Sequence, residues 1–266
     1  MLKLLAVAAL TALLPAASFA ELAPRDCTDH FVAGDLPEVG SARTPKTHLL
    51  CFSEYAVLHS GLSKTPVWSA EHLTSERIET AETLKRKNSF HAENALPESE
   101  RAELSDYKGS GFDRGHMSPS GDMSTPKGQR ESFSLANMIP QDPCSNEEQW
   151  EGIESAVRSL VKQEDEVFVV TGPIYPADAD ISQIGDGVLI PPQIFKAIYI
   201  PSLNAGAAYV APNTADKEFT VVTLQDLKGI IDIDVFPNVA HKVKVAAFDL
   251  PSPEPAKFHC RVHSPN

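Results

Sequence analysis

The sequence predicts an α+β protein with antiparallel sheets flanked by helices. Segments that alternate apolar and polar residues are mixed along the chain with segments of helical periodicity, and they lack the strand–helix–strand rhythm of a parallel sheet. Apolar residues make up 42% of the chain, an ordinary fraction, and no internal repeat is visible. The chain without its N-terminal leader is about 245 residues long, enough for one large domain with a substantial core.

Residues 1–20 have the pattern of a signal peptide. Lys3 supplies the positive start, residues 4–14 form an apolar run, and residues 18–20 place small side chains where a signal peptidase reads them. A membrane anchor is the weaker alternative, because the run is too short to span a hydrocarbon layer of about 30 Å. We therefore expect an exported protein without a membrane span, secreted or periplasmic.

The chain after residue 20 divides into an N-terminal extension, residues 21–50, and one large domain, residues 51–266. Residues 21–47 are rich in proline and irregular, whereas residues 49–58 alternate enough to predict a strand. A second extended piece is expected from residue 65 to 70. The charged stretch 71–106 predicts a helical fragment followed by a long surface loop.

A capping box predicts the start of the main helix. Ser145 is followed three residues later by Glu148, and apolar residues then recur at helical spacing, so we expect a helix over residues 146–162. Strands are expected at 167–171, 188–190, 195–200 and 207–210. By similar capping logic residues 223–226, Thr-Leu-Gln-Asp, open a short helix, another helix is expected at 238–244, and a last strand at 245–250.

One stretch combines a carboxylate, a guanidinium and an imidazole within four positions: Asp113-Arg114-Gly115-His116. It continues as Met-Ser-Pro-Ser-Gly-Asp-Met through residue 123, and a second cluster follows at residues 135–141, Leu-Ala-Asn-Met-Ile-Pro-Gln. Arginine can hold a phosphate, histidine can accept a proton from water, and nearby oxygens suit a divalent metal. These residue types together indicate phosphodiester cleavage.

These motifs resemble the DNA/RNA non-specific endonucleases, the ββα-metal (His-Me finger) nucleases with an Asp-Arg-Gly-His motif. The similarity also takes in the approach segment 106–112, the lead-in 132–135, the segment 169–175 and parts of 190–198, and so covers roughly residues 51–250. The resemblance implies that fold, a Mg²⁺ cofactor with Mn²⁺ as the alternative, and DNA and RNA as substrates.

The resemblance also implies a role for each site residue. His116 is the general base, and Arg114 holds the phosphate and stabilises charge in the transition state. Asn146 is the metal ligand, and Glu154, eight residues later and near the same edge of the helix, accepts hydrogen bonds from metal-bound water. Asn137 fixes His116 or a phosphate oxygen. The expected products carry 5′-phosphate and 3′-hydroxyl ends, after metal-bound water protonates the leaving oxygen.

The sequence departs from the family pattern in one place. Relatives carry a further arginine shortly before a tryptophan, and Pro66 stands near that place here, so that Lys64, Arg77 or Arg86 would have to replace it. The basic run 85–87 is either a solvated patch or a contact for substrate phosphates. His59 is either a neighbour of the site or an ordinary core or surface histidine.

Two other functions remain compatible with the sequence. The protein is alternatively a phosphodiesterase for small nucleotides, or a binding protein on a nuclease scaffold with little or no activity. The net charge of −13 opposes tight binding of nucleic acid, because phosphate backbones attract lysine and arginine. A nuclease, however, needs turnover rather than tight binding. The sequence predicts no oligomeric state, and a homodimer remains open.

The four cysteines, Cys27, Cys51, Cys144 and Cys260, predict two disulfides in an exported protein. Three pairings are possible, and we favour Cys27–Cys51 with Cys144–Cys260. No two cysteines have the close spacing of a zinc site.

Overall fold

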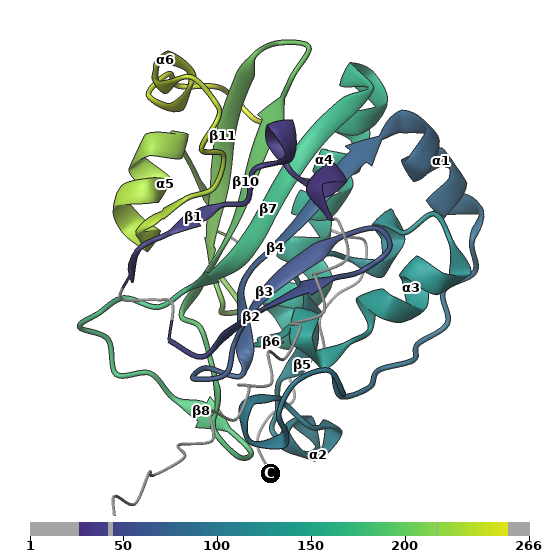
Figure 1. Cartoon of the computed structure of the whole chain (residues 1–266), viewed down its shortest axis with the longest axis vertical. Coiled ribbons are helices and arrows are strands. Elements are labelled where there is room, and N and C mark those ends of the chain that lie inside the picture. Colours follow the sequence, from purple (N-terminus) through teal and green to yellow (C-terminus); the bar gives the residue numbers. More distant parts are fainter. Residues whose placement is uncertain (1–26, 42–44, 217, 255–266) are drawn as a thin grey trace, which may run out of the picture.

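The computed structural model describes residues 27–41, 45–216 and 218–254 of the chain. Within those ranges the main sheet has seven strands, and every neighbouring pair is antiparallel (Figure 1). The predicted α+β class with antiparallel sheets is therefore confirmed. Across the sheet the strands are β12 (Thr220–Val222), β11 (Ala205–Pro212), β10 (Gln193–Ile200), β7 (Glu166–Ile174), β4 (Thr65–Thr74), β3 (Ala56–Ser60) and β2 (Thr47–Cys51).

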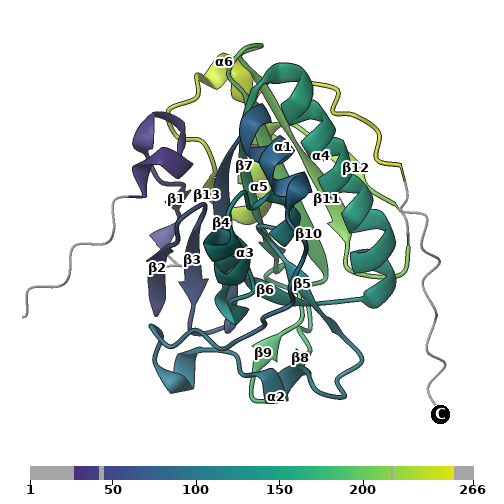
Figure 2. The same cartoon turned by 90° about the vertical axis from the view of Figure 1, so that its right-hand side faces the viewer.

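Helices cover both faces of this sheet (Figures 1 and 2). The helices are α1 (Ser75–Thr83), α2 (Leu104–Tyr107), α3 (Pro126–Ser132), α4 (Glu151–Glu164), α5 (Leu224–Ile231) and α6 (His241–Lys244). The remaining strands form three small pairs: β1 (Glu38–Val39) with β13 (Ile233–Asp234), β5 (Asp113–His116) with β6 (Met138–Gln141), and β8 (Gln183–Ile184) with β9 (Val188–Leu189).

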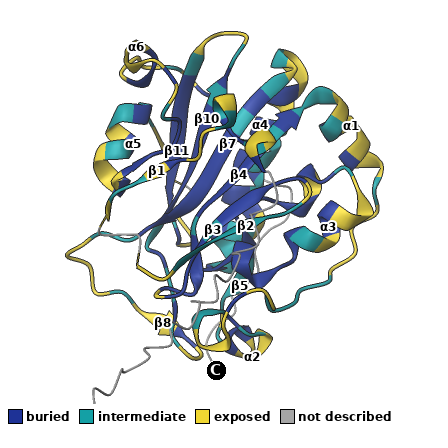
Figure 3. Ribbon diagram, in the orientation of Figure 1, coloured by how far each residue is buried: buried dark blue, intermediate teal, exposed yellow. Residues whose placement is uncertain are grey.

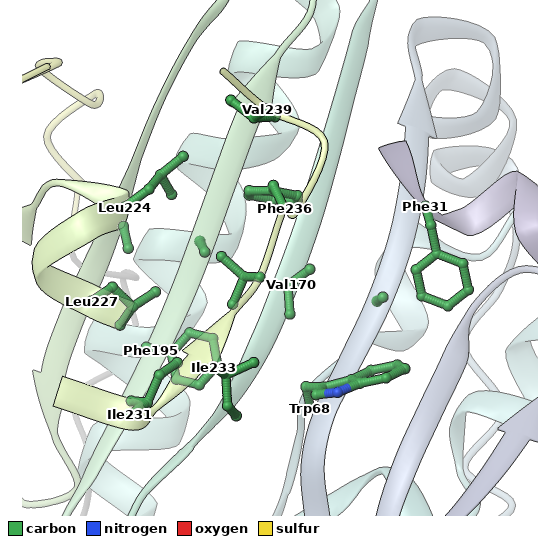
Figure 4. Close-up of a cluster of buried hydrophobic side chains, with 14 of the residues drawn as sticks. Phe31, Trp68, Val170, Phe195, Leu224, Leu227, Ile231, Ile233, Phe236 and Val239 are labelled. Carbon is green, nitrogen blue, oxygen red and sulfur yellow. The ribbon is translucent and has the colours of Figure 1, made fainter. Parts of the chain in front are cut away.

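The central strands β4, β7, β10 and β11 are buried on both sides, so the molecule has a separate core on each face of the sheet (Figure 3). Successive side chains of a strand point to opposite faces. In β7, Val170 packs with α5 whereas Val169 packs with α4. Figure 4 shows the α5 core, where Phe195 lies close to Leu227 and Ile231. The α4 core is the one next to the site described below.

The main helix begins earlier than the capping box predicts. Asp142 accepts hydrogen bonds from the backbone N–H groups of Cys144 (2.9 Å) and Ser145 (3.1 Å), so its side chain caps the helix. Residues 143–144 are already helical, and Ser145–Trp150 form a π-helical turn before α4. Ser145 as the N-cap is therefore wrong. A wide π turn re-aims the side chains that it carries, and such turns are frequent at functional sites.

Two strand predictions are also wrong. Residues 49–58 form a hairpin rather than one strand, because the chain turns between β2 and β3 and Phe52 N–H bonds to the Tyr55 carbonyl (2.9 Å). Residues 245–250 are not a strand. The other expected strands and helices are present with shifted ends, and Thr223 caps α5 as its sequence pattern suggests, accepting from the Asp226 N–H (3.0 Å).

The N-terminal segment is irregular apart from two short 3-10 turns, Thr28–His30 and Val32–Gly34, and strand β1. The predicted Cys27–Cys51 disulfide is confirmed, with its Cα atoms 5.5 Å apart. Cys144 is also disulfide-bonded. Its predicted partner Cys260 lies outside the described residues, as does the predicted signal peptide, residues 1–20. None of the described helices combines the length and the apolar character that crossing a bilayer requires.

Candidate active site

The Asp-Arg-Gly-His motif forms strand β5, which pairs with β6 over its whole length. His116 lies opposite Met138, and beyond this pair Met117 N–H bonds to the Asn137 carbonyl (3.0 Å). Figure 2 shows β5 and β6 between α3 and the lower end of α4. Two short strands followed by a helix are the ββα unit, and it brings His116 to the same place as the first turns of the main helix.

A pocket of about 480 Å³ opens at this unit. Its size is ordinary for a ligand site. The lining residues come from the loop after α1, from β5 and the turn that follows it, and from the main helix. They are Arg86, Asn88, Phe90, Asp113, Arg114, His116, Pro119, Ser120, Gly121, Asn146, Glu147, Glu151, Glu154 and Arg158.

His116 is 8% exposed and lies against two aromatic rings. Its ring centroid is 5.0 Å from that of Phe133 and 5.7 Å from that of Phe90. Nε2 has no hydrogen-bond partner among the described residues. Burial, together with the positive charges of Arg86 and Arg114, lowers the pKa of His116 to about 3. The imidazole is therefore neutral over the physiological range, and its Nε2 atom is buried.

Asn146 is held by its neighbour Asp113. The Asn146 Nδ2 group donates a hydrogen bond to Asp113 Oδ2 (2.9 Å). Because this bond uses the amide nitrogen, the oxygen Oδ1 faces the other way, and it is the atom of an asparagine that binds hard cations. Asp113 thus acts on the site through Asn146, and not through the salt bridge to Arg114 that its position in the sequence suggests.

Glu154 lies one turn before Arg158 on α4. The distance from Arg158 Nη1 to Glu154 Oε2 is 4.0 Å, and the same guanidinium donates to Asp122 Oδ1 at 3.1 Å. Burial raises the pKa of Glu154 to about 7, although the charges of Lys196 and Arg158 oppose this effect. A carboxylate in this state can accept hydrogen bonds from water in the pocket.

Two arginines that line the pocket lie over aromatic rings. The Arg114 guanidinium lies over the Phe90 ring, 4.2 Å from its centroid, and Arg86 lies 5.4 Å from the centroid of Phe133. Asn88 Oδ1 accepts a hydrogen bond from Arg86 Nε (2.8 Å). Aromatic faces attract guanidinium groups, so these contacts orient both cations toward the space in front of His116.

Of the three proposed replacements for the arginine of the family pattern, Arg86 is the one that lines the pocket. Lys64 pairs with Asp186 (3.2 Å). Arg77 donates to the backbone carbonyls of Asp122 (2.8 Å) and His72 (2.7 Å).

Asn137 does not line the pocket. It is fully buried, and Oδ1 accepts from Ser118 N–H (3.0 Å) and from the Ser69 hydroxyl (3.0 Å). Its Nδ2 donates to the carbonyls of Ser118 (2.8 Å) and Ser132 (3.0 Å). Asn137 therefore fixes the backbone that follows His116 and has no free polar atom for a phosphate.

Gly115 and His59 are also structural. A Cβ atom at Gly115 would come within 1.9 Å of the Gln141 side-chain oxygen, so β5 needs glycine there to pair closely with β6. His59 is buried, and its Nε2 lies 2.8 Å from the Glu100 carbonyl. It is a core histidine.

Sequence reasoning missed Arg158 and Asp122 as parts of the site. Arg158 carries a usable signal, since it follows Glu154 by four residues and so lies on the same side of the helix. Asp122 carries none. It belongs to the turn after His116 and meets Arg158 across 36 residues of chain, a contact that only the fold creates.

Comparisons with known proteins agree with this geometry. The sequence profile of the DNA/RNA non-specific endonucleases matches residues 32–242. Nuclease C1 of Cunninghamella echinulata var. echinulata is 32% identical over 183 residues, 64% of this chain and 73% of that protein. A nuclease of Nostoc is 32% identical over 221 residues, 76% of this chain and 78% of that protein.

Human mitochondrial nuclease EXOG is 29% identical over 215 residues, which cover 73% of this chain and 58% of the human protein. Among solved structures, a chain of the EndoG/EndoGI complex matches with a TM-score of 0.64 and 25% identity, over 74% of this chain and 89% of that one. That structure describes the mechanism of EndoG inhibition. Together with the profile match and the ββα unit around His116, these findings show that the chain belongs to the DNA/RNA non-specific endonuclease family.

Proposed function

We propose that the protein is an exported endonuclease that depends on a divalent metal and hydrolyses DNA and RNA with little sequence preference. One observation carries the proposal: a neutral His116, the oriented amide of Asn146 and three arginines line a single pocket. A site that holds the phosphodiester backbone and does not read base edges accepts any sequence. We expect 5′-phosphate and 3′-hydroxyl products.

The residues fit a hard cation. Asn146 Oδ1 would hold the ion, and the Glu154 carboxylate would accept hydrogen bonds from its water shell. Among the described residues, no three acidic, histidine or cysteine side chains are grouped as a complete metal cage. This donor set suits Mg²⁺, or Mn²⁺, which keeps most of its waters and needs few protein ligands. When bound, the ion would supply positive charge opposite the phosphate as negative charge develops.

His116 would accept a proton from the attacking water. Its pKa of about 3 makes it a weak base in the free enzyme. A phosphodiester between Arg86 and Arg114 would offset the two positive charges that lower this pKa. Substrate binding would therefore strengthen the base at the moment that it is needed.

The three arginines would bind the phosphate and the charge that develops on it. Arg86 and Arg114 face it from the side of β5, and Arg158 faces it from α4, where Asp122 fixes its guanidinium. Charge-assisted hydrogen bonds from planar guanidinium groups are strong and directional. Because Arg86 lines the pocket, we assign to it the role of the arginine that the family pattern places before the tryptophan.

Cleavage assays test the proposal. The chain from residue 21 to 266, with its disulfides formed, is incubated with supercoiled plasmid, single-stranded DNA and RNA, in Mg²⁺ or in EDTA. We expect metal-dependent cutting of all three, loss of at least about 10³-fold in His116→Ala, and full activity in His241→Ala, an exposed control on α6. Cutting of the closed plasmid establishes an endonuclease.

Other outcomes would overturn the proposal. Hydrolysis of small nucleotide diesters alone would make the protein a phosphodiesterase. Binding of nucleic acid without cutting, under any metal, would make it a binding protein.

Export has separate support. The Cys27–Cys51 disulfide suits an oxidising compartment, and residues 1–20 have the composition of a signal peptide. We propose a secreted or periplasmic location. N-terminal sequencing of the protein recovered outside the cytoplasm should begin at Glu21, and an uncleaved or cytoplasmic protein would contradict this.

A further inference from the structure

The segment from Leu84 to Phe90 separates the active-site pocket from a second pocket. Arg86, Asn88 and Phe90 line the active-site pocket. The residues between them, Lys85, Lys87 and Ser89, line the neighbouring pocket instead. The segment is therefore extended, with alternate side chains on opposite sides. A wall one chain thick divides the two spaces.

The second pocket, which we call the flanking pocket, has a volume of about 410 Å³. Its other wall is α3, to which the segment is tied by a hydrogen bond from Lys87 N–H to Gln129 Oε1 (2.9 Å). Gln129 is buried, which fixes this wall. The lining residues are Leu84, Lys85, Lys87, Ser89, Pro126, Gln129 and Arg130.

The flanking pocket combines apolar walls with positive charge. Leu84 and Pro126 are apolar, whereas Lys85, Lys87 and Arg130 are exposed cations, and no carboxylate is among the lining residues. A separate pocket around Arg77, by contrast, is lined by Asp29, Glu54 and Glu76. In a chain of net charge −13, a polyanion is repelled by most of the surface, so a carboxylate-free cluster of cations marks where it can dock.

We propose that the flanking pocket binds a nucleotide of the substrate strand next to the one being cut. This inference rests on the proposed function. Lys85, Lys87 and Arg130 contact the phosphate of the flanking nucleotide, and its base or sugar packs on Leu84 and Pro126. The strand crosses the wall at Arg86, which holds the scissile phosphate on the other side.

The shape of the pocket favours a single strand as the occupant. A base has to leave its stack to enter a pocket, which costs least where the strand is already unpaired. Apolar side chains beside cations match the alternation of base and phosphate along such a strand, and this type of contact tolerates any base. The pocket would add affinity without adding sequence preference.

A binding experiment tests this without requiring cleavage. In a His116→Ala background, a fluorescent single-stranded oligonucleotide of about twelve nucleotides is titrated against the variant Lys85→Ala/Lys87→Ala/Arg130→Ala. We expect the Kd to rise at least about tenfold, and the slope of log Kd against log salt to fall by about 0.7, the contribution of one phosphate contact on a single strand.

A second triple variant controls for net charge. Lys46→Ala/Lys162→Ala/Lys242→Ala removes the same charge from exposed lysines outside both pockets, and its Kd and salt slope should stay close to those of the parent. In the active enzyme, the flanking-pocket variant should raise KM for the oligonucleotide with kcat nearly unchanged.

The outcomes separate this inference from the proposed function. Equal binding by the two triple variants overturns the flanking pocket, even if the enzyme cuts nucleic acid. If the wild type cuts nothing but the flanking-pocket variant alone loses affinity, the nuclease proposal fails and the pocket stands as a nucleic-acid site. Tighter binding of an acidic peptide than of the oligonucleotide, lost in the same variant, overturns the inference in favour of a protein partner.

Discussion

Asp113 orients the side chain of Asn146, which is far from it in sequence. It accepts the Asn146 Nδ2 hydrogen bond at 2.9 Å, across 33 residues of chain. An asparagine amide can turn by half a rotation and exchange its oxygen for its nitrogen, and only the oxygen binds a cation. The carboxylate of Asp113 therefore selects the amide orientation that binds metal, without touching the metal itself.

Replacing Asp113 should weaken the binding of Mg²⁺ more than it lowers the cleavage rate at saturating Mg²⁺. We expect Asp113→Ala to raise the Mg²⁺ concentration for half-maximal cleavage by about 10- to 100-fold, with much of the rate recovered at saturating metal. Asp113→Asn keeps an acceptor oxygen, so its half-maximal Mg²⁺ concentration should lie between those of the wild type and of Asp113→Ala. Plasmid cleavage rates measured against Mg²⁺ concentration check this. A lower rate at every concentration with an unchanged midpoint would show that Asp113 does not act through the metal site.

At the scale of elements, β4 places a carboxylate inside the core beneath the active site. Glu71 is 1% exposed, and neither carboxylate oxygen has a hydrogen-bond partner among the described residues. Arg77 Nη2 lies 3.8 Å away. Burial raises the pKa of Glu71 from 4.5 to about 8, and the charge of Asp122 adds to this, against the opposing charges of Lys196 and Arg77. The folded protein therefore keeps this carboxyl protonated at neutral pH.

The raised pKa makes stability depend on pH. Between about pH 4.5 and pH 8 the folded state holds a proton on Glu71 that the unfolded state has lost, so the free energy of unfolding falls as pH rises through this window. One proton corresponds to about 1.4 kcal/mol per pH unit at most. Glu71→Gln should reduce the slope of Tm against pH between pH 5.5 and 8. Part of the slope should remain because of Glu154.

Glu79→Gln is the matched control for this measurement, because Glu79 is exposed on α1. Its slope should equal that of the wild type. An unchanged slope in Glu71→Gln would mean that Glu71 is ionised in the folded protein and is balanced by Lys196 and Arg77.

At the scale of the whole molecule, the N-terminal segment is part of the α5 core. The Cys27–Cys51 disulfide joins it to β2, and Phe31 packs edge-on against Trp68 of β4 with centroids 5.8 Å apart (Figure 4). The disulfide closes a loop between residues 24 apart in sequence. Closing such a loop restricts the unfolded chain, which stabilises the folded state by about 3.5 kcal/mol in the chain-entropy model.

Removing this disulfide should lower stability without disabling the site. We expect Cys27→Ser/Cys51→Ser to reduce the free energy of unfolding by about 3 kcal/mol, measured by urea titration, while cleavage at 25 °C stays near that of the wild type. The active-site pocket is lined by other segments of the chain, which is the reason for the second expectation. A large loss of activity in the folded variant would show that the N-terminal segment shapes the site.

The sequence by itself determined the motif and the faces of single elements. The order of residues 113–116, the spacing of Asn146 and Glu154, and the apolar stripe of α4 are local patterns, and local geometry fixes which side chains share one face. The ends of elements are less well determined by the sequence. Asp142, which lies outside the predicted capping box, caps the main helix in place of Ser145. The turn between β2 and β3 contains no glycine, proline, asparagine or aspartate, so the local sequence does not predict that the chain reverses there.

The tertiary structure alone decided which distant segments meet. It placed Arg86 in the same pocket as His116, joined Asp122 to Arg158, and turned Asn137 away from the pocket into the hydrogen bonds that hold Ser118. These contacts join residues far apart in sequence, and each depends on how the helices and the loop after α1 pack on one sheet. The periodicity of a single segment does not predict these long-range contacts, because they depend on the simultaneous burial of both cores.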